Sequence, residues 1–404
     1  MKKLLFNPIV AAYLGIEISA ATAIACTFAT YIPFLSDRGM NLWQINIINA
    51  FYMAMVFLAE LPTGSFADRF GRHRSLVISF GLMIIGHLVY FSAPSFAIFI
   101  VAELILAAGI TFYSGAAESW MVDSLKVRNE HHLQAKIFRL TPILKSVGTV
   151  VGVVFGAYLG NFNLAWPWLA SSLLTIITFV LALRLKENYR SSFEKKSSGG
   201  LNQQFHYAWN YGVKNPNLFL VMAFGGMLAF SVQAVNMQWT LMFQADYGFN
   251  SLHLGLIFMA SSILSSLGSK YSHRLTGGLN GLPAIILPQV FTGAAIIACS
   301  FITGANLMLI VFSLHNLGRG IIKPLHQDFI NDHLESETRA TLLSLDSMFL
   351  KAGAFTGLLV SGFVAQATSI RTTWFFAGSF LIVGVVLFFL AIKARERRAN
   401  VAVT

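Results

Sequence analysis

Long uninterrupted apolar runs constrain this chain more than any other feature of its sequence. Residues 9–35 and 373–392 are two such runs. A membrane-spanning helix needs about 20 predominantly apolar residues, whereas the strands of a membrane barrel alternate over about ten. Only 11% of the 404 residues are charged, against about 25% in a soluble globular chain. The sequence therefore predicts an all-α integral membrane protein.

The apolar runs are numerous enough to define a multi-pass topology. Twelve transmembrane helices are predicted, at 9–35, 44–65, 76–94, 96–122, 136–160, 166–185, 217–243, 252–270, 283–303, 306–325, 340–365 and 373–393. A long polar stretch divides them six and six. We therefore expect an N-terminal six-helix bundle over 1–185, a cytoplasmic linker over 186–216 and a C-terminal six-helix bundle over 217–404.

The two halves share a weak internal repeat, as the halves of transporters often do. A shift of 205 positions matches five residues in or beside spans four and five with identical residues in or beside spans ten and eleven: Gly115 with Gly320, Asp123 with Asp328, Ala135 with Ala340, Gly148 with Gly353 and Gly152 with Gly357. This repeat predicts that the two six-helix bundles are pseudo-symmetric.

Lysine and arginine gather on one side of the predicted topology. The loops that share a side with both termini carry most of the 28 basic residues, while the other side carries only Arg38 and Arg371. Basic loops stay in the cytoplasm, so both termini are expected to be cytoplasmic. The net charge of +11 is thus a topology signal, and we expect no nucleic-acid partner.

The segment between spans two and three, ELPTGSFADRFGRHRS over 60–75, concentrates charge between two apolar runs. We call it the signature segment. Asp68 lies at the membrane edge, where a carboxylate is costly unless it is paired, and the three arginines that follow it can pair with it. Gly64 has no side chain, so two helices can approach closely there. Alternatively, these charges only hold the loop on the cytoplasmic side.

The pattern Gly64-x-x-x-Asp68-Arg69-x-Gly71-Arg72 resembles the signature between the second and third helices of the major facilitator superfamily. Twelve spans, the six-plus-six division and the basic central loop fit that family along the whole chain. The resemblance implies that the acid and an arginine of the motif engage an acid at the inner end of helix four, here Asp123. These six residues would form a latch that holds helix eleven in one transport state and releases it in another.

Two neighbouring patterns refine this resemblance. The residues Glu60-Leu61-Pro62-Thr63-Gly64 resemble a bacterial branch of the family that includes tetracycline exporters of the clostridial kind, which implies the bacterial inner membrane. The counterpart of the signature segment in the second half keeps a glycine at Gly268 and a base at Arg274, but Ser272 stands where the acid is expected. A latch on one side only is therefore expected.

Ionisable residues inside the spans are candidates for transport, because an unpaired charge there costs at least about 2.5 kcal/mol. The first half offers Glu17, Glu60, Glu103 and Glu118. Glu17 could instead belong to a buried helix-packing pair or be a solvated acid at a cavity edge. Lys145 in span five is expected to neutralise a nearby acid.

The second half offers candidates of the opposite sign. Arg319 and Lys323 are four residues apart and share one face of span ten. They could form an anion site, or Lys323 could extend to the cytoplasm. Alternatively, Lys323 could form an ion pair with Glu118, which the shift of 205 aligns with it, and this pair would break during alternating access. Gln233 and Asn236 in span seven are candidate polar groups of a substrate cavity, as is the aromatic Trp120 in span four.

The sequence favours transport over enzymatic activity. It contains no Gly-x-x-x-x-Gly-Lys-Ser/Thr stretch, so the energy is expected to come from an ion gradient or from the substrate's own gradient. Two isolated cysteines support neither a disulfide framework nor a metal site, and no cofactor is expected. The leading hypothesis is a monomeric exporter in the lipid bilayer that couples alternating access to protons and carries small amphipathic or drug-like compounds. The alternative is a proton-coupled carrier of an anionic metabolite or siderophore.

Overall fold

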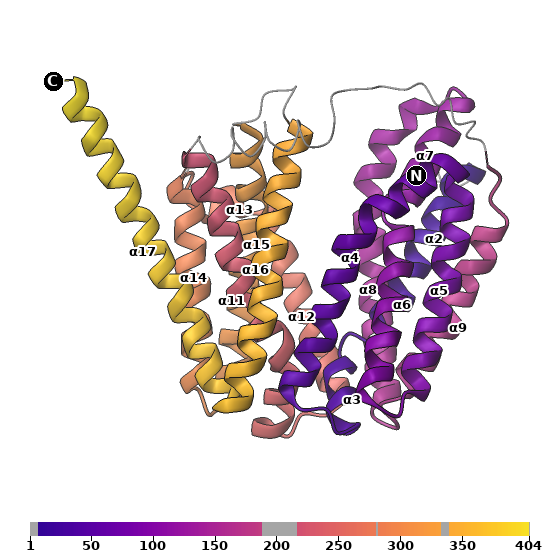
Figure 1. Ribbon diagram of the computed structural model, residues 1–404, viewed down its shortest axis with the longest axis horizontal. Helices are drawn as coiled ribbons and strands as arrows, with labels where there is room; N and C mark the ends of the chain where they lie inside the picture. The colour runs from indigo at the N-terminus through magenta and orange to yellow at the C-terminus, as the bar shows by residue number, and fades with distance from the viewer. Residues whose placement is uncertain (1–6, 188–215, 280–281, 333–338, 404) are drawn as a thin grey trace. The chain divides into compact units, whose positions relative to one another are not determined.

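The computed structural model describes residues 7–187, 216–279, 282–332 and 339–403, and these ranges contain helices and no strand (Figure 1). The helices are α2 (Pro8–Ala25), α3 (Tyr31–Asp37), α4 (Leu42–Phe70), α5 (Arg72–Ser92), α6 (Phe96–Tyr113), α7 (Ala116–Val127), η1 (His131–Leu133), α8 (Gln134–Gly160), α9 (Trp166–Leu183), α11 (Pro216–Tyr247), α12 (Ser251–Lys270), α13 (Ser272–Leu275), α14 (Leu282–Phe301), α15 (Ala305–Asp332), α16 (Arg339–Ala367) and α17 (Ile370–Val403). In this part of the chain, twelve helical segments are long and apolar enough to cross a membrane. The predicted fold class is confirmed.

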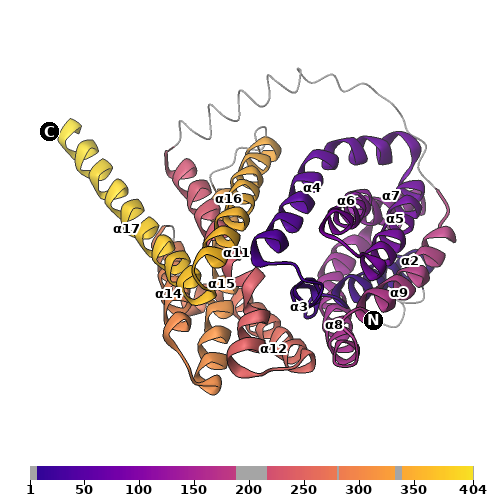
Figure 2. The same cartoon turned by 60° about the horizontal axis from the view of Figure 1, so that its bottom comes forward.

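The chain divides into two compact units. The N-terminal unit comprises Met1–Glu194 and Gly248–Met259, and the C-terminal unit comprises Lys195–Tyr247 and Ala260–Thr404. Within the N-terminal unit, α2 packs against α8 and α9, and α6 packs against α4 and α5. Within the C-terminal unit, α11 packs against α16 and α17, and α14 packs against α15 and α17. Figures 1 and 2 show the long helices of each unit running side by side as a bundle.

Two of the three glycine pairs matched by the internal repeat have the same packing role in both units. A Cβ atom at Gly152 of α8 would overlap the backbone of α2 at Thr22. A Cβ atom at Gly357 of α16 would overlap the backbone of α11 at Phe230 in the same way. Small residues allow this close approach of helices in a membrane. The repeat in the sequence therefore marks a helix–helix contact that occurs once in each unit.

The first apolar run is not the single span predicted over 9–35. Helix α2 ends at Ala25, the backbone turns, and α3 begins at Tyr31. In the turn, the hydroxyl groups of Thr27 and Thr30 donate to the carbonyl oxygens of Ile24 and Thr27, over 3.4 and 3.3 Å. Threonine hydroxyls that bond to the nearby backbone compete with helix formation, which explains an interruption that apolarity alone does not predict.

The fourth span, predicted as continuous over 96–122, is also interrupted. Helix α6 ends at Tyr113 and α7 begins at Ala116, while Gly115 has a φ of +72° that favours glycine. The carbonyl groups in the last turn of α6 lose their helical donors at this break. The Ser75 hydroxyl of α5 donates to one of them, the carbonyl oxygen of Phe112, over 2.7 Å.

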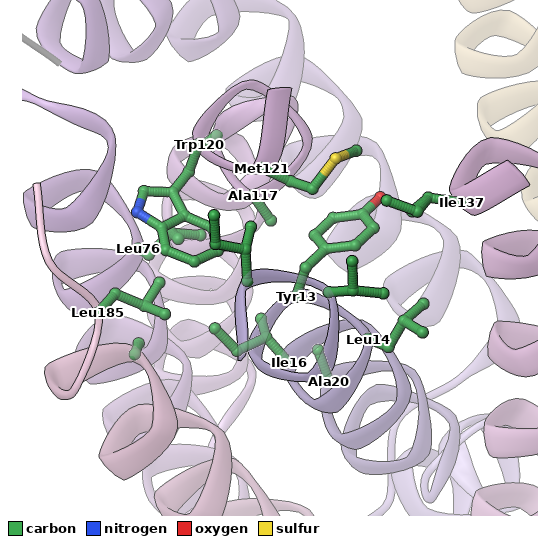
Figure 3. Close-up of a cluster of buried hydrophobic side chains, with 14 of the residues drawn as sticks. Tyr13, Leu14, Ile16, Ala20, Leu76, Ala117, Trp120, Met121, Ile137 and Leu185 are labelled. Carbon is green, nitrogen blue, oxygen red and sulfur yellow. The ribbon is translucent and has the colours of Figure 1, made fainter. Parts of the chain in front are cut away.

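The hydrophobic core of the N-terminal unit lies where α2, α5, α7 and α8 meet. Figure 3 shows Leu76, Trp120, Met121 and Ile137 gathered with residues of α2 in this cluster. Trp120 is 5% exposed, and its indole nitrogen donates to the carbonyl oxygen of Lys186 over 3.0 Å. Trp120 therefore packs in the core, and it is absent from the cavity lining described next.

Candidate functional site

A cavity of about 460 Å³ opens within the N-terminal unit. This volume lies in the range of small-molecule sites, about 300–1,000 Å³. Residues from α2, α6, α7, α8 and the break between α6 and α7 form its wall: Tyr13, Glu17, Ile110, Tyr113, Ser114, Gly115, Ala117, Glu118, Phe138, Thr141, Pro142 and Lys145. Two of the predicted pathway residues, Glu17 and Glu118, thus share one cavity.

Glu17 is held in the cavity wall by two partners from other helices. The ammonium group of Lys145 lies 2.6 Å from one carboxylate oxygen, and the Tyr113 hydroxyl donates to the other over 2.6 Å. The side chain of Glu17 is only 7% exposed, against 41% for Lys145. The Lys145 ammonium also lies 5.6 Å from the centre of the Tyr113 ring. The expectation that Lys145 neutralises an acid is confirmed, and that acid is Glu17.

Helix hydrogen bonding is altered at two places in the cavity wall: it is broken between α6 and α7, and one bond is missing inside the continuous α8. The break at Ser114 and Gly115 places the first turn of α7, including the exposed Glu118, at the wall. Pro142 in α8 has no backbone N–H, so it cannot donate the usual helical bond to the carbonyl group of Phe138. Interrupted helices expose backbone dipoles, and transporters place them around their substrate sites.

The charges of the cavity favour cationic or neutral amphipathic molecules. Its lining contains two acids, Glu17 and Glu118, and one base, Lys145, so its formal charge is −1 when all three are ionised. Tyr13, Tyr113 and Phe138 supply aromatic surface, which attracts cations as well as apolar groups. A bound cation would compete with Lys145 for the carboxylate of Glu17.

Among the residues predicted to form the latch, the structure shows one ion pair. Asp68 pairs with Arg72 over 2.6 Å, whereas the guanidinium of Arg69 lies over the Phe70 ring, 5.2 Å from its centre. Asp123 is half-buried and forms no ion pair with any residue in the described ranges. The close helix approach expected at Gly64 is absent in this conformation, because a Cβ atom there would have nothing within 4 Å.

Gly71 of the signature segment allows a contact that sequence reasoning missed. Its φ of +104° suits glycine, and a Cβ atom there would collide with the carboxylate of Glu187. That carboxylate accepts a hydrogen bond from the backbone N–H of His73, over 2.8 Å, at the start of α5. Helix N-termini attract anions, so Glu187 stabilises this end of α5. The only signal was an acid a few residues after span six.

The C-terminal unit retains a contact at the positions that correspond to the latch. A shift of 205 residues carries Asp68 onto His273 and Asp123 onto Asp328. His273 Nε2 lies 3.2 Å from Asp328 Oδ2, and both side chains are more than half exposed. The acid of the motif is missing here: Ser272 follows Gly268 by four residues, as Asp68 follows Gly64, and the neighbouring His273 contacts Asp328, which the repeat matches to Asp123.

The predicted second-half candidates form a polar chain in the C-terminal unit. Arg319 of α15 donates to the side-chain oxygen of Asn236 over 2.9 Å, and Asn236 donates to Gln233 over 3.1 Å. No acid in the described part of the chain lies within ion-pairing distance of Arg319. Lys323 is exposed one turn further along α15 and is not part of this chain of hydrogen bonds.

Sequence reasoning also missed a buried histidine–aspartate pair in the C-terminal unit. His326 Nε2 of α15 lies 2.9 Å from Asp346 Oδ1 of α16, and both residues are buried. The available signal was that an acid in span eleven needs a partner.

The remaining predicted acids lie outside the cavity. Glu60 is exposed on α4, one turn before Gly64. Glu103 of α6 is buried with 5% exposure, where tyrosines from α3 and α5 contact it. The cavity therefore brings together Glu17 and Glu118 but neither Glu60 nor Glu103.

Comparisons with known proteins agree with this architecture. A family model described as Major Facilitator Superfamily matches residues 13–345 and 282–403. The uncharacterized MFS-type transporter YxaM of Bacillus subtilis (strain 168) is 21% identical over 92% of this chain and 93% of its own. The class C tetracycline resistance protein of Escherichia coli is 23% identical over 87% of each chain. The crystal structure of the nucleoside transporter NupG matches 96% of this chain and 99% of its own with a TM-score of 0.81 at 14% identity, a likeness of fold alone.

Proposed function

The chain belongs to the major facilitator superfamily, and from this premise we propose that it is a proton-coupled exporter of small amphipathic, drug-like compounds. The observation that carries the proposal is the cavity of the N-terminal unit, where the Glu17 carboxylate lies between Lys145 and Tyr113. The similarity to a tetracycline resistance protein supports an amphipathic substrate. Alternating access between two states would expose this cavity to one side of the membrane at a time.

The ion pair in the cavity provides a physical means of exchange. A cationic or polar substrate group draws the Glu17 carboxylate away from Lys145, and substrate release allows the pair to form again. Glu118, in the first turn of α7, adds a second acid to the cavity wall. We assign to the substrate and proton pathway the eight residues that the sequence singled out: Glu17, Glu60, Glu103, Glu118, Gln233, Asn236, Arg319 and Lys323.

The latch residues would control the change between the two transport states. Asp68, Arg69, Arg72 and Asp123 would stabilise one transport state, Gly64 would allow a close helix approach in the other state, and Gly71 would keep the turn between α4 and α5 open to Glu187. The Asp68–Arg72 pair supports this role. The basic loops support a cytoplasmic position for the signature segment and both termini, and we propose that the protein is a monomer in the bacterial inner membrane.

Everted membrane vesicles test the proposed function directly. An exporter in this orientation moves substrate into the vesicle lumen and protons out of it, so adding ethidium or tetracycline should dissipate an established pH gradient. A fluorescent pH indicator records the response, and vesicles without the protein are the control. Absence of any response with both the cationic and the neutral-zwitterionic probe would rule out this form of transport.

Arg319 favours a second candidate function, the carriage of an anionic metabolite or siderophore. Its guanidinium is fixed by Asn236, and no acid in the described residues neutralises it. A charge inside a membrane span is costly unless a partner compensates it, and a substrate carboxylate or phosphate would be such a partner.

Replacing Arg319 with Gln tests this second candidate. A hydrogen bond to a charged group contributes about 1.5–3 kcal/mol, so anion binding should weaken roughly 10- to 100-fold. Calorimetric titration with citrate and with a ferric siderophore measures the change. Arg139→Gln, an exposed base on α8, is the matched control. Equal anion affinity in the wild type, Arg319→Gln and Arg139→Gln would contradict the anion site.

A further inference from the structure

A buried carboxyl group in the N-terminal unit is held only by neutral side chains. Glu103 of α6 is 5% exposed. The Tyr31 hydroxyl of α3 donates to one of its oxygens over 3.3 Å, and the Tyr90 hydroxyl of α5 donates to the other. Asn49 of α4 donates to the Tyr31 oxygen over 3.1 Å. Three helices thus direct polar groups to one acid of a fourth.

Aromatic rings pack against the two tyrosines that contact Glu103. The Trp168 ring of α9 stacks on the Tyr90 ring with centres 3.9 Å apart and an angle of 5° between the planes. It also meets Tyr31 edge-on at 5.9 Å. The other titratable groups nearby are Tyr52 of α4, which interacts electrostatically with Glu103, and the buried His87 of α5, whose ring is 6.2 Å from Trp168.

In the part of the chain that the structure describes, no cation compensates the charge of Glu103. Among the described residues, neither lysine nor arginine lies within ion-pairing distance of this carboxyl group. Glu17 differs, because Lys145 pairs with it directly. Burying an uncompensated carboxylate is far more costly than burying a neutral acid. The surroundings of Glu17 therefore suit the ionised form, and those of Glu103 suit the protonated form.

We propose that Glu103 carries the coupled proton, while the Glu17–Lys145 pair serves the substrate. This inference rests on the proposed function and divides its two tasks between two sites of the same unit. A proton from water forms an O–H bond with the Glu103 carboxylate in one transport state, and that bond breaks to return the proton to water in the other state. Tyr31 and Tyr90 are positioning residues, because their hydroxyl groups fix the carboxyl group in both forms.

Infrared spectroscopy tests the protonated acid without requiring transport. The purified protein in lipid nanodiscs at neutral pH should show the carbonyl stretching band of a protonated carboxyl group. That band should disappear in Glu103→Gln and remain in Glu17→Gln. In Tyr90→Phe it should move to higher frequency, because the carboxyl group loses one hydrogen bond. Absence of the band in the wild type, or its persistence in Glu103→Gln, would overturn the proposal.

Transport in vesicles tests the division of tasks. Glu103→Gln should abolish ethidium accumulation driven by a pH gradient, while ethidium counterflow without a gradient persists. Glu17→Gln should reduce both. If the wild type moves neither ethidium nor tetracycline, the proposed function fails, and the infrared band still decides the proton site. Removal of the band by sodium at constant pH would show a sodium site instead and would overturn the assignment to protons.

Discussion

Replacing Lys145 with Met is expected to lower the free energy of unfolding by about 2–4 kcal/mol and to stop transport. Removing one partner of a buried ion pair costs about 3–5 kcal/mol, because the other charge is left uncompensated. The lower range applies here because the Lys145 side chain is 41% exposed. Denaturant titration of the purified protein in detergent measures the loss of stability, and the vesicle assay measures transport.

The double replacement Glu17→Gln and Lys145→Met separates stability from function. It removes both charges of the pair, so most of the lost stability should return, because neutral groups of similar size can replace a buried pair with little loss. Transport should remain absent, since the cavity then lacks the carboxylate that the substrate engages. Recovery of transport in the double variant would show that the pair only stabilises the fold.

Replacing Asp68 and Asp123 with Asn together is expected to slow turnover and to shift the balance between the inward- and outward-open states. Couplings of this kind amount to about 1–3 kcal/mol, or roughly 5- to 150-fold in a population ratio. The loss of Asp68 removes the partner of Arg72, and the loss of Asp123 removes the acid that the latch would engage. Transport rates measure turnover. The accessibility to a thiol reagent of single cysteines, introduced on each side of the membrane, measures the balance between the inward- and outward-open states.

Asp328→Asn is the matched control for this experiment. Asp328 corresponds to Asp123 after the shift of 205 residues, and its contact with His273 is largely exposed. The motif in the second half lacks its acid, with Ser272 at that position, so a one-sided latch predicts a small effect of this change on turnover. A one-sided latch is untenable if Asp328→Asn slows turnover as much as the double replacement does.

The fold could be predicted because apolar length and loop charge are properties of the sequence itself. Runs of more than 20 apolar residues marked the spans, and glycines spaced by the repeat marked contacts such as that of Gly152 with α2. The interruptions after Ala25 and Tyr113 could not be predicted in this way. Both occur inside apolar segments, and they depend on hydroxyl groups and on one glycine conformation that hydropathy does not register.

The sequence indicated which residues are candidates for the site, but not which side chains contact one another. The cost of an acid in the membrane singled out Glu17 and Glu103, but the sequence does not show which one has a compensating base. That distinction depends on Lys145 reaching Glu17 from another helix, and on Tyr31 reaching Glu103 through the turn between α2 and α3. Glu187 was missed because an acid just after a span resembles an ordinary solvated loop residue.

The paired glycine contacts also bear on how the chain is made. The contact of Gly152 with α2 lies wholly within the first half of the sequence, and the contact of Gly357 with α11 lies wholly within the second. Each can therefore form as soon as its own helices have left the ribosome and entered the bilayer. The contact between α2 and α8 can then be in place before the second half of the chain has been synthesised.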